Sequence, residues 1–330
     1  MKKIIWIPAL LVLLLAACSS KTDDTGSSKG TSPLTGEKAS DSADRRTVAV
    51  MVNNHPKARP QTGLSEADIV FELLAEGNIT RFMALYQSTE PKEVGPVRSA
   101  REYYFKLADG YNAIYVYHGA AKFVDEKLKA SGVDYINGAQ HDDDGVLFKR
   151  SADRVAPHNS YLQFSAVMDQ AKKAGYKTTA SVKPLPFLKE DAAVEGEEAE
   201  KIDIRYTSDD AYNSEFRYNK EEDSYQRWSD GDQTADLGTE QPVAVQNVFV
   251  IEAHHEVIDK DGRRSIDLES GGKAYLFQKG QMQQLEWKNE DGRIIPYRDG
   301  KAVSFVPGKT WISVVPDDPG LEASVQPGNE

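Results

Sequence analysis

An arginine-rich stretch, Gly95–Arg101, holds the side chains of this sequence most suited to binding an anion. Because proline is tolerated in the first turn of a helix, Pro96 predicts a helix start, with Arg98 and Arg101 on one face. Arginine at this end opposes the helix dipole, which favours negative charge there. Free backbone N–H groups, Ser99 and two guanidinium groups would then form a pocket for a carboxylate or a phosphate.

Ion pairing within the protein is the alternative role for these arginines, with Glu72, Glu76 or Glu102 as partner. Glu72 lies inside the apolar run IVFELL, so its charge needs a partner once the strand is buried. We expect a salt bridge across a hairpin to Arg81, which opens the next strand. A catalytic acid is the other interpretation of Glu72.

Histidines and asparagines lie where predicted elements end. His118 closes one strand, Asn54 and His55 follow another, and His158 and Asn159 lie in the loop APHNS. Open α/β sheets bind ligands at the ends of their strands, so these side chains could meet at one rim. There they could contact the anion or move protons. The spacing contains no HExxH or comparable motif, so neither a metal site nor a cofactor is expected.

No nucleophile motif such as GxSxG stands out, which favours binding over catalysis. The acidic stretches Asp142–Gly145 and Asp259–Gly262 are expected to be solvated turns. Aromatic residues of the second half could form either a sugar-stacking platform or, as we expect, the core of a small β domain. They are Tyr218, Tyr225, Trp228, Trp287 and Trp311.

The lone cysteine, Cys18, follows a basic start and a short apolar run typical of a secretory signal over residues 1–17. Leu15-Ala16-Ala17-Cys18 resembles a bacterial lipobox. That resemblance implies acyl groups on the Cys18 sulfur and cleavage before it. It predicts a lipid-anchored protein on the extracytoplasmic face of the cell membrane, with the bilayer as a partner.

The formal net charge is −12, and an acidic protein is a poor partner for nucleic acid. Any anionic envelope ligand must therefore be held by a local basic pocket. Residues 18–45 are rich in Ser, Thr, Gly, Asp and Lys, which predicts a flexible tether, with local docking of residues 32–36 as the alternative.

The folded part is expected to have an α/β (or α+β) domain over residues 46–189 and a smaller, mostly β domain over residues 202–317. An acidic linker, 190–201, separates them, and residues 318–330 are expected to be a loose tail. In the first domain the predicted strands are Thr47–Asn53, Asp68–Leu74, Arg81–Gln87 and Ala113–His118. The predicted helices are Arg98–Gly110, Lys122–Gly132 and Tyr161–Gly175.

Several long stretches resemble the YerB-like bacterial lipoproteins. They are VMVNNHPKARPQTGLSEADIVFELLAEGNITRFMALY, EVGPVRSAREYYFKLADGYNAIYVYHGA and RVAPHNSYL in the first half, with GKAYLFQKGQMQQLEWKN and VSFVPGKTWISVVP in the second. The family often has Glu-Gly-Gly where this chain has Glu76-Gly77-Asn78, a change that a turn tolerates. The resemblance implies a two-domain lipoprotein and no particular reaction.

Three functions follow as hypotheses. The first is a binding or scaffold lipoprotein that holds an anionic envelope ligand, or a partner's acidic group, at Arg98, Ser99 and Arg101. The second is a cell-wall hydrolase or transferase with His118 or His158 as base and Glu72 as acid. The third is a module that only binds another protein.

Overall fold

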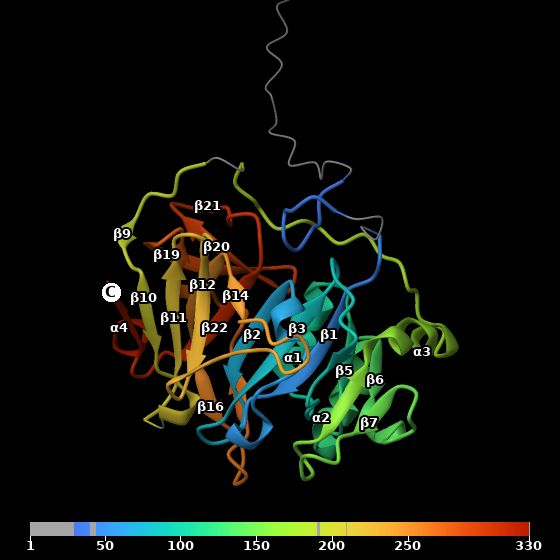
Figure 1. The fold of residues 1–330 in the computed structure, drawn as a ribbon. Helices are drawn as coiled ribbons and strands as arrows, with labels where there is room; N and C mark the ends of the chain where they lie inside the picture. Colours follow the sequence, from blue (N-terminus) through green and yellow to red (C-terminus); the bar gives the residue numbers. More distant parts are fainter. Residues whose placement is uncertain (1–29, 40–43, 190–191, 209, 330) are drawn as a thin grey trace, which may run out of the picture.

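One large mixed sheet forms the middle layer of the molecule (Figure 1). The computed structural model describes residues 30–39, 44–189, 192–208 and 210–329. Within these ranges the strand order is β21-β20-β19-β18-β15-β22-β2-β3-β1-β5-β6, with β9 paired to β19. The strands are β1 Val48–Asn53, β2 Ile69–Leu74, β3 Thr80–Tyr86, β5 Ile114–Tyr117, β6 Tyr135–Asn137, β9 Glu197–Glu198, β15 Asn247–Ala253, β18 Gly272–Gln278, β19 Gln281–Glu290, β20 Arg293–Arg298, β21 Lys301–Ala302 and β22 Thr310–Pro316.

The large sheet joins the two halves of the sequence. β2 pairs in parallel with β22, from Ile69 opposite Thr310 to Leu73 opposite Val314. β22 also pairs in parallel with β15, so it lies between strands from both halves. The sheet therefore crosses the boundary expected between residues 189 and 202.

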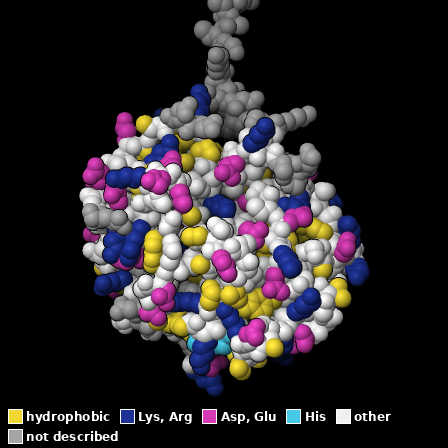
Figure 2. Space-filling model, in the orientation of Figure 1, with side chains coloured by type: hydrophobic (Ala, Val, Ile, Leu, Met, Phe, Trp, Pro, Cys, Tyr) yellow, Lys and Arg dark blue, Asp and Glu magenta, His cyan; other side chains and the backbone are white. Residues whose placement is uncertain are grey.

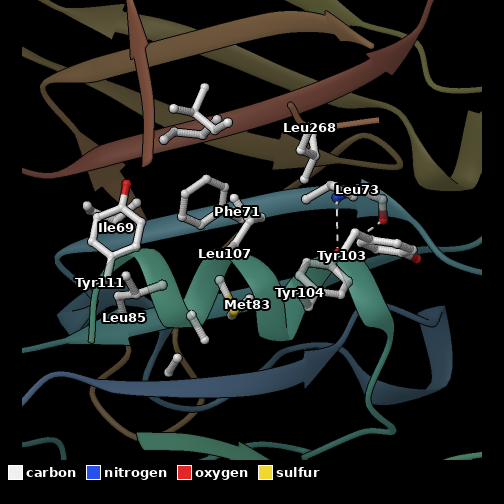
Figure 3. Packing of buried hydrophobic residues seen from close by; sticks show 14 of the residues in the cluster. Ile69, Phe71, Leu73, Met83, Leu85, Tyr103, Tyr104, Leu107, Tyr111 and Leu268 are labelled. Atoms are coloured by element: carbon white, nitrogen blue, oxygen red, sulfur yellow. Dashed lines mark hydrogen bonds between the residues drawn. The ribbon is translucent and has the colours of Figure 1, made fainter. Parts of the chain in front are cut away.

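Both faces of the large sheet are covered around β1, β2 and β3. In β1, Ala49 and Met51 belong to one hydrophobic cluster, while Val48, Val50 and Val52 belong to another. Continuous burial of this kind is typical of strands covered on both faces. Helices α1 (Glu102–Gly110) and α2 (Lys122–Ser131) cover the first face, and Figure 3 shows α1 against β2 and β3.

A second sheet covers part of the opposite face, in the order β13-β12-β11-β10-β23, with β14 also on β12. Its strands are β10 Lys201–Ile204, β11 Ser214–Asn219, β12 Ser224–Ser229, β13 Asp232–Gln233, β14 Ala244–Val245 and β23 Val325–Gly328. A small sheet of β4 (Glu93–Val94), β7 (Phe148–Arg150) and β8 (Ser160–Gln163) also packs on this face, with α3 (Val167–Lys173).

A two-stranded hairpin and a short helix lie outside these sheets. The hairpin pairs β16 (His255–Val257) with β17 (Arg264–Ile266), and α4 (Leu321–Ser324) precedes β23. No helix in the described ranges is long and apolar enough to cross a membrane.

The predicted fold class is confirmed, because helices and strands mix in the first half and strands dominate the second. Two predicted helices differ from the structure. α1 begins at Glu102, and Arg101 before it is extended with φ −136° and ψ 153°. Residues 160–163 form β8 rather than the start of a helix, because they pair with β7 and β4.

Two segments expected to be loose are ordered by apolar contacts. Leu34, within the predicted tether, is fully buried in the cluster beneath α1. Pro33 accepts a hydrogen bond from the Leu185 N–H at 3.0 Å, and Thr35 accepts one from the Gly308 N–H at 2.7 Å. In the predicted tail, β23 pairs with β10 and buries Val325.

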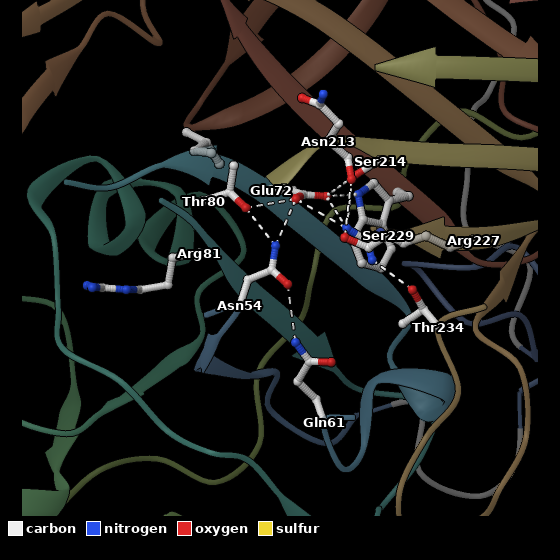
Figure 4. A network of polar contacts seen from close by, with 12 residues as sticks. Asn54, Gln61, Glu72, Thr80, Arg81, Asn213, Ser214, Arg227, Ser229 and Thr234 are labelled. Carbon is white, nitrogen blue, oxygen red and sulfur yellow. Dashed lines mark hydrogen bonds and ion pairs between the residues drawn. The ribbon is translucent and has the colours of Figure 1, made fainter. Parts of the chain in front are cut away.

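A buried ion pair joins the large sheet to the second sheet (Figure 4). Glu72 of β2 lies 3.1 Å from Arg227 of β12, and both side chains are at most 1% exposed. The carboxylate also accepts hydrogen bonds from Ser214 at 3.0 Å and from the Trp311 indole N–H at 3.2 Å. Glu72 therefore pairs with Arg227 rather than with Arg81, the partner expected from the sequence.

Removing one member of this pair should destabilise the whole protein. We expect Arg227→Met to lower the free energy of unfolding by about 3–5 kcal/mol, because it leaves the Glu72 charge buried without its partner. Urea denaturation of the full chain measures this. Arg217→Met is the matched control: Arg217 lies on β11, is 43% exposed and pairs with Glu215, so we expect a loss of about 0–1 kcal/mol. A loss below about 1 kcal/mol for Arg227→Met would contradict the account.

Candidate functional site

Arg98 lies where the large sheet meets β8, in an extended segment held by backbone hydrogen bonds. Its N–H donates to Met51 of β1 and its carbonyl accepts from the His118 N–H, both at 2.9 Å. The N–H of Val97 donates to Ser160 of β8 at 2.7 Å. These bonds replace the expected helical turn and fix Arg98 at the carboxyl ends of the parallel strands β1 and β5.

The guanidinium group of Arg98 has no hydrogen-bond or ion-pair partner among the described residues, and its Nε atom is buried. Burial, and secondarily the charge of Arg81, lower the pKa of Arg98 to about 10. The group is therefore still positive at neutral pH. A largely buried cation without a counter-charge is costly, so this position favours an anion supplied from outside the protein.

The neighbouring arginines are already paired. Arg81 and Arg101 both bind Glu76 at the β2–β3 turn, Arg81 at 2.9 Å. Arg81 also donates to the carbonyl of Ser99 at 2.9 Å. Of the three residues expected to form an anion pocket, Arg101 is thus occupied, the carbonyl of Ser99 supports Arg81, and Arg98 alone keeps an unpaired charge.

Three histidines lie close enough to Arg98 for its charge to act on them. The rings of His55 and His158 lie with centroids 4.5 Å apart and planes at 37°. Burial lowers the pKa of His55, His118 and His158, and the charge of Arg98 lowers each further. The structure thus brings the rings of His55 and His158 together, whereas the ring of His118 contacts Phe148 instead. We call Arg98 and these three histidines the Arg98 site.

Hydrogen bonds to the ring nitrogens indicate which tautomer two of these histidines adopt. His55 Nδ1 accepts from the Lys57 N–H at 3.1 Å. Asn53 Oδ1 accepts from the His55 N–H at 3.0 Å, so the Asn53 amide nitrogen donates to His158 Nδ1 at 2.9 Å. Both neutral rings must then carry their proton on Nε2. Each ring can therefore donate a hydrogen bond from Nε2–H to an anion.

His118 has different partners. Its Nδ1 lies 2.8 Å from Ser160 Oγ, and its Nε2 lies 3.8 Å from an Asp142 carboxylate oxygen. Arg150 holds the same carboxylate, with Nε at 2.8 Å. The Asp142 charge is thus shared with Arg150 and does not compensate Arg98.

Two expected ligand-binding residues serve as supports. Asn54 is fully buried, donates to Thr80 at 2.7 Å and accepts from Arg59 at 3.1 Å. Asn159 accepts from Arg150 at 2.7 Å and donates to the Ser151 carbonyl at 3.2 Å. Each amide holds a loop that carries a histidine.

Glu72 is not placed to act as an acid for the histidines. Its partners are the side chains described above together with Asn54 at 3.2 Å and Thr80 at 2.9 Å, none of them a histidine. The expected pairing of Glu72 with His118 or His158 therefore does not form, because Arg227 and its neighbours occupy the carboxylate.

Arg154 is a supporting residue that sequence reasoning missed. It donates to the carbonyls of Ala58 and Pro60, both at 2.7 Å, and so ties the loop of His158 to the loop of His55. Its position four residues before His158 is the only sequence signal. In the described part of the chain neither Arg154 nor Lys57 has an ion-pair partner, which adds to the positive charge near the site.

The positive Arg98 site is a local feature of an acidic protein. On the face shown in Figure 2, acidic and basic side chains are interspersed. Among the described residues, no group of three or more His, Cys, Asp or Glu side chains is placed to hold a metal ion. A guanidinium group and an imidazole Nε2–H group are both donors from which an oxyanion accepts hydrogen bonds.

Comparisons with known proteins identify relatives over nearly the whole chain. Residues 34–177 match the N-terminal domain, and residues 202–312 the C-terminal domain, of a family described as protein of unknown function (DUF3048). The chain is 48% identical over 323 residues to YerB of Bacillus subtilis (strain 168), named as a candidate lipoprotein, covering 96% of both chains. The crystal structure of YerB from Bacillus subtilis superposes with a TM-score of 0.82 at 47% identity, covering 90% of this chain and 99% of that one.

The histidines of the Arg98 site should titrate below the ordinary histidine pKa of 6.5, because burial and Arg98 disfavour the charged rings. Protonating them is therefore linked to unfolding, and the free energy of unfolding should fall as the pH drops below 6.5. A histidine NMR titration measures this directly. His254 is the internal control, because its hydrogen bond to Asp317 raises its pKa. A titration midpoint above pH 6.5 for His55 or His158 would contradict this prediction, because it would require an anionic group beside the ring.

Proposed function

The chain belongs to the DUF3048 family, and from that premise we propose that it is a lipid-anchored binding protein of the cell envelope that holds an oxyanion at the Arg98 site. The single observation that carries the proposal is the partly buried Arg98 guanidinium, which has no counter-charge among the described residues. The Nε2–H groups of His55 and His158 supply further donors. Phosphate groups of an envelope ligand and carboxylates of a partner share the chemistry that this site recognises.

Anchoring through Cys18 is supported by the lipobox-like stretch and by the similarity to a candidate lipoprotein. Cys18 and the signal stretch lie outside the described residues. Acyl groups there would hold the protein on the extracytoplasmic face of the membrane.

Replacing Cys18 should release the protein from membranes. We expect Cys18→Ala to move the chain from the membrane pellet to the soluble fraction or to leave it uncleaved. Fractionation and the mass of the mature chain distinguish these results. A cleaved variant that stays tightly in the pellet would contradict the anchor.

Anion binding is tested by sulfate, which keeps its charge between pH 5 and 8, unlike phosphate. Calorimetry on the full chain in detergent, at constant ionic strength, should show saturable sulfate binding that strengthens as the pH falls below 6.5. Arg98→Ala should weaken this binding about tenfold or more, because charge-assisted hydrogen bonds contribute about 1.5–3 kcal/mol. Arg98→Lys should retain part of it.

Arg298→Ala is the control, because Arg298 is an exposed arginine on β20, remote in sequence from the site. It should leave sulfate affinity unchanged. Glycerol phosphate and acetate, tested in the same way, separate a phosphate ligand from a carboxylate ligand. Absence of saturable binding by all three anions would overturn the proposal.

A hydrolase is the second candidate function, because Ser160 Oγ lies 2.8 Å from His118 Nδ1. His118 is held neutral by burial, so it could accept the serine proton. Ser160 is only 3% exposed, which favours the binding function. Ester hydrolysis that is lost in Ser160→Ala while sulfate binding persists would favour the hydrolase.

A further inference from the structure

A second candidate site lies on the outer face of the second sheet, beyond the proposed anion-binding function. A cavity of about 330 Å³ opens where β10, β11 and β12 end. This volume is at the lower end of the range of small-molecule sites. Its lining includes Trp228, Asp203, Glu215, Arg217, Arg205 and Asp230.

Strand register places an aromatic ring and two carboxylates in one row across this face. Asp203 of β10 lies opposite Glu215 of β11, and Glu215 lies opposite Trp228 of β12. Gln326 on β23 and Gln233 on β13 extend the row at its two ends. Because side chains of a strand alternate between faces, this row points away from the buried Phe216 and Arg227.

Trp228 differs from the other tryptophans of the described residues. Trp287 and Trp311 are fully buried in the core, as expected for the five aromatic residues named from the sequence of this half. Trp228 is partly exposed, and the Arg217 guanidinium lies 4.6 Å from its ring centroid. The indole is thus a partly covered apolar surface within a polar cavity.

The charges around Trp228 are balanced rather than positive. Lys201 lies 3.3 Å from Asp203 and 3.2 Å from Glu215, and Arg217 also binds Glu215. At the mouth, Asp230 and Arg205 are both exposed and of opposite charge. A cavity of this kind offers paired donors and acceptors but no net charge, so it selects an uncharged ligand with many hydroxyl groups.

We propose that this cavity binds a neutral oligosaccharide, with a sugar ring stacked on Trp228. The apolar face of a pyranose ring packs on an aromatic ring, while neighbouring hydroxyl groups match the two oxygens of a carboxylate or the fork of a guanidinium. Glu215 lies beside Trp228 on the adjacent strand, and Asp203 lies one strand further along the same row, so both can accept hydrogen bonds from hydroxyl groups of a ligand that extends along it.

The test uses the full chain in a detergent whose headgroup is not a sugar. Tetrasaccharides of β-1,4-linked N-acetylglucosamine and of glucose are titrated while tryptophan fluorescence and heat are recorded. At least one should bind saturably and change the emission of Trp228. Trp228→Ala should weaken binding about tenfold or more, and Asp203→Asn should weaken it as well.

Two controls make the result specific. Tyr297→Ala removes another aromatic residue that carries a cation over its ring, Lys288 at 4.5 Å, and should leave sugar binding unchanged. Arg98→Ala should also leave it unchanged, which separates this site from the anion site. Failure of both sugars to bind, or unchanged affinity in Trp228→Ala, would overturn the proposal.

Discussion

The buried ion pair between Glu72 and Arg227 is the interaction on which the rest of the structure depends. Two charges removed from water are stable only when each is satisfied, and here the carboxylate has Arg227, Ser214, Asn54, Thr80 and Trp311 around it. These partners come from both sheets and both halves of the sequence. The pair therefore requires the two halves to fold as one body. Through Asn54 it also fixes the end of β1, which carries His55.

At the Arg98 site, unlike at the Glu72–Arg227 pair, a charge has no partner among the described residues. Arg81 and Arg101 share Glu76, whereas Arg98 keeps a charge that no residue in the described ranges neutralises. Backbone bonds from Arg98 to β1 and to His118, and from Val97 to β8, hold Arg98 in place, so the cost of burying it is offset by the surrounding fold. Binding an anion would remove that cost. The paired arginines Arg81 and Arg101 stabilise the structure, whereas the unpaired Arg98 marks a candidate binding site.

Local patterns predicted much of the fold. The strands around Val48–Asn53, Ile69–Leu74 and Ile114–Tyr117 follow from runs of β-branched and aromatic residues bounded by turn residues. Long-range pairing could not be predicted from local patterns. Arg227 is 155 residues from Glu72 in the sequence, and β22 of the second half pairs with β2 of the first half. Arg98 was expected on a helix because backbone bonds to β1 and β8 are invisible in the sequence. Leu34 is a single apolar residue that gives no periodic signal, so the sequence predicts a tether there, with local docking of residues 32–36 as the alternative.

Anomalous diffraction from crystals soaked in selenate, an anion of the same shape and charge as sulfate, would show whether Arg98 binds an oxyanion. We expect an anomalous peak within hydrogen-bond distance of the Arg98 guanidinium and of the Nε2 atoms of His55 and His158. This expectation would be contradicted by a structure in which a protein carboxylate occupies Arg98, or in which selenate binds elsewhere and leaves this site without a peak.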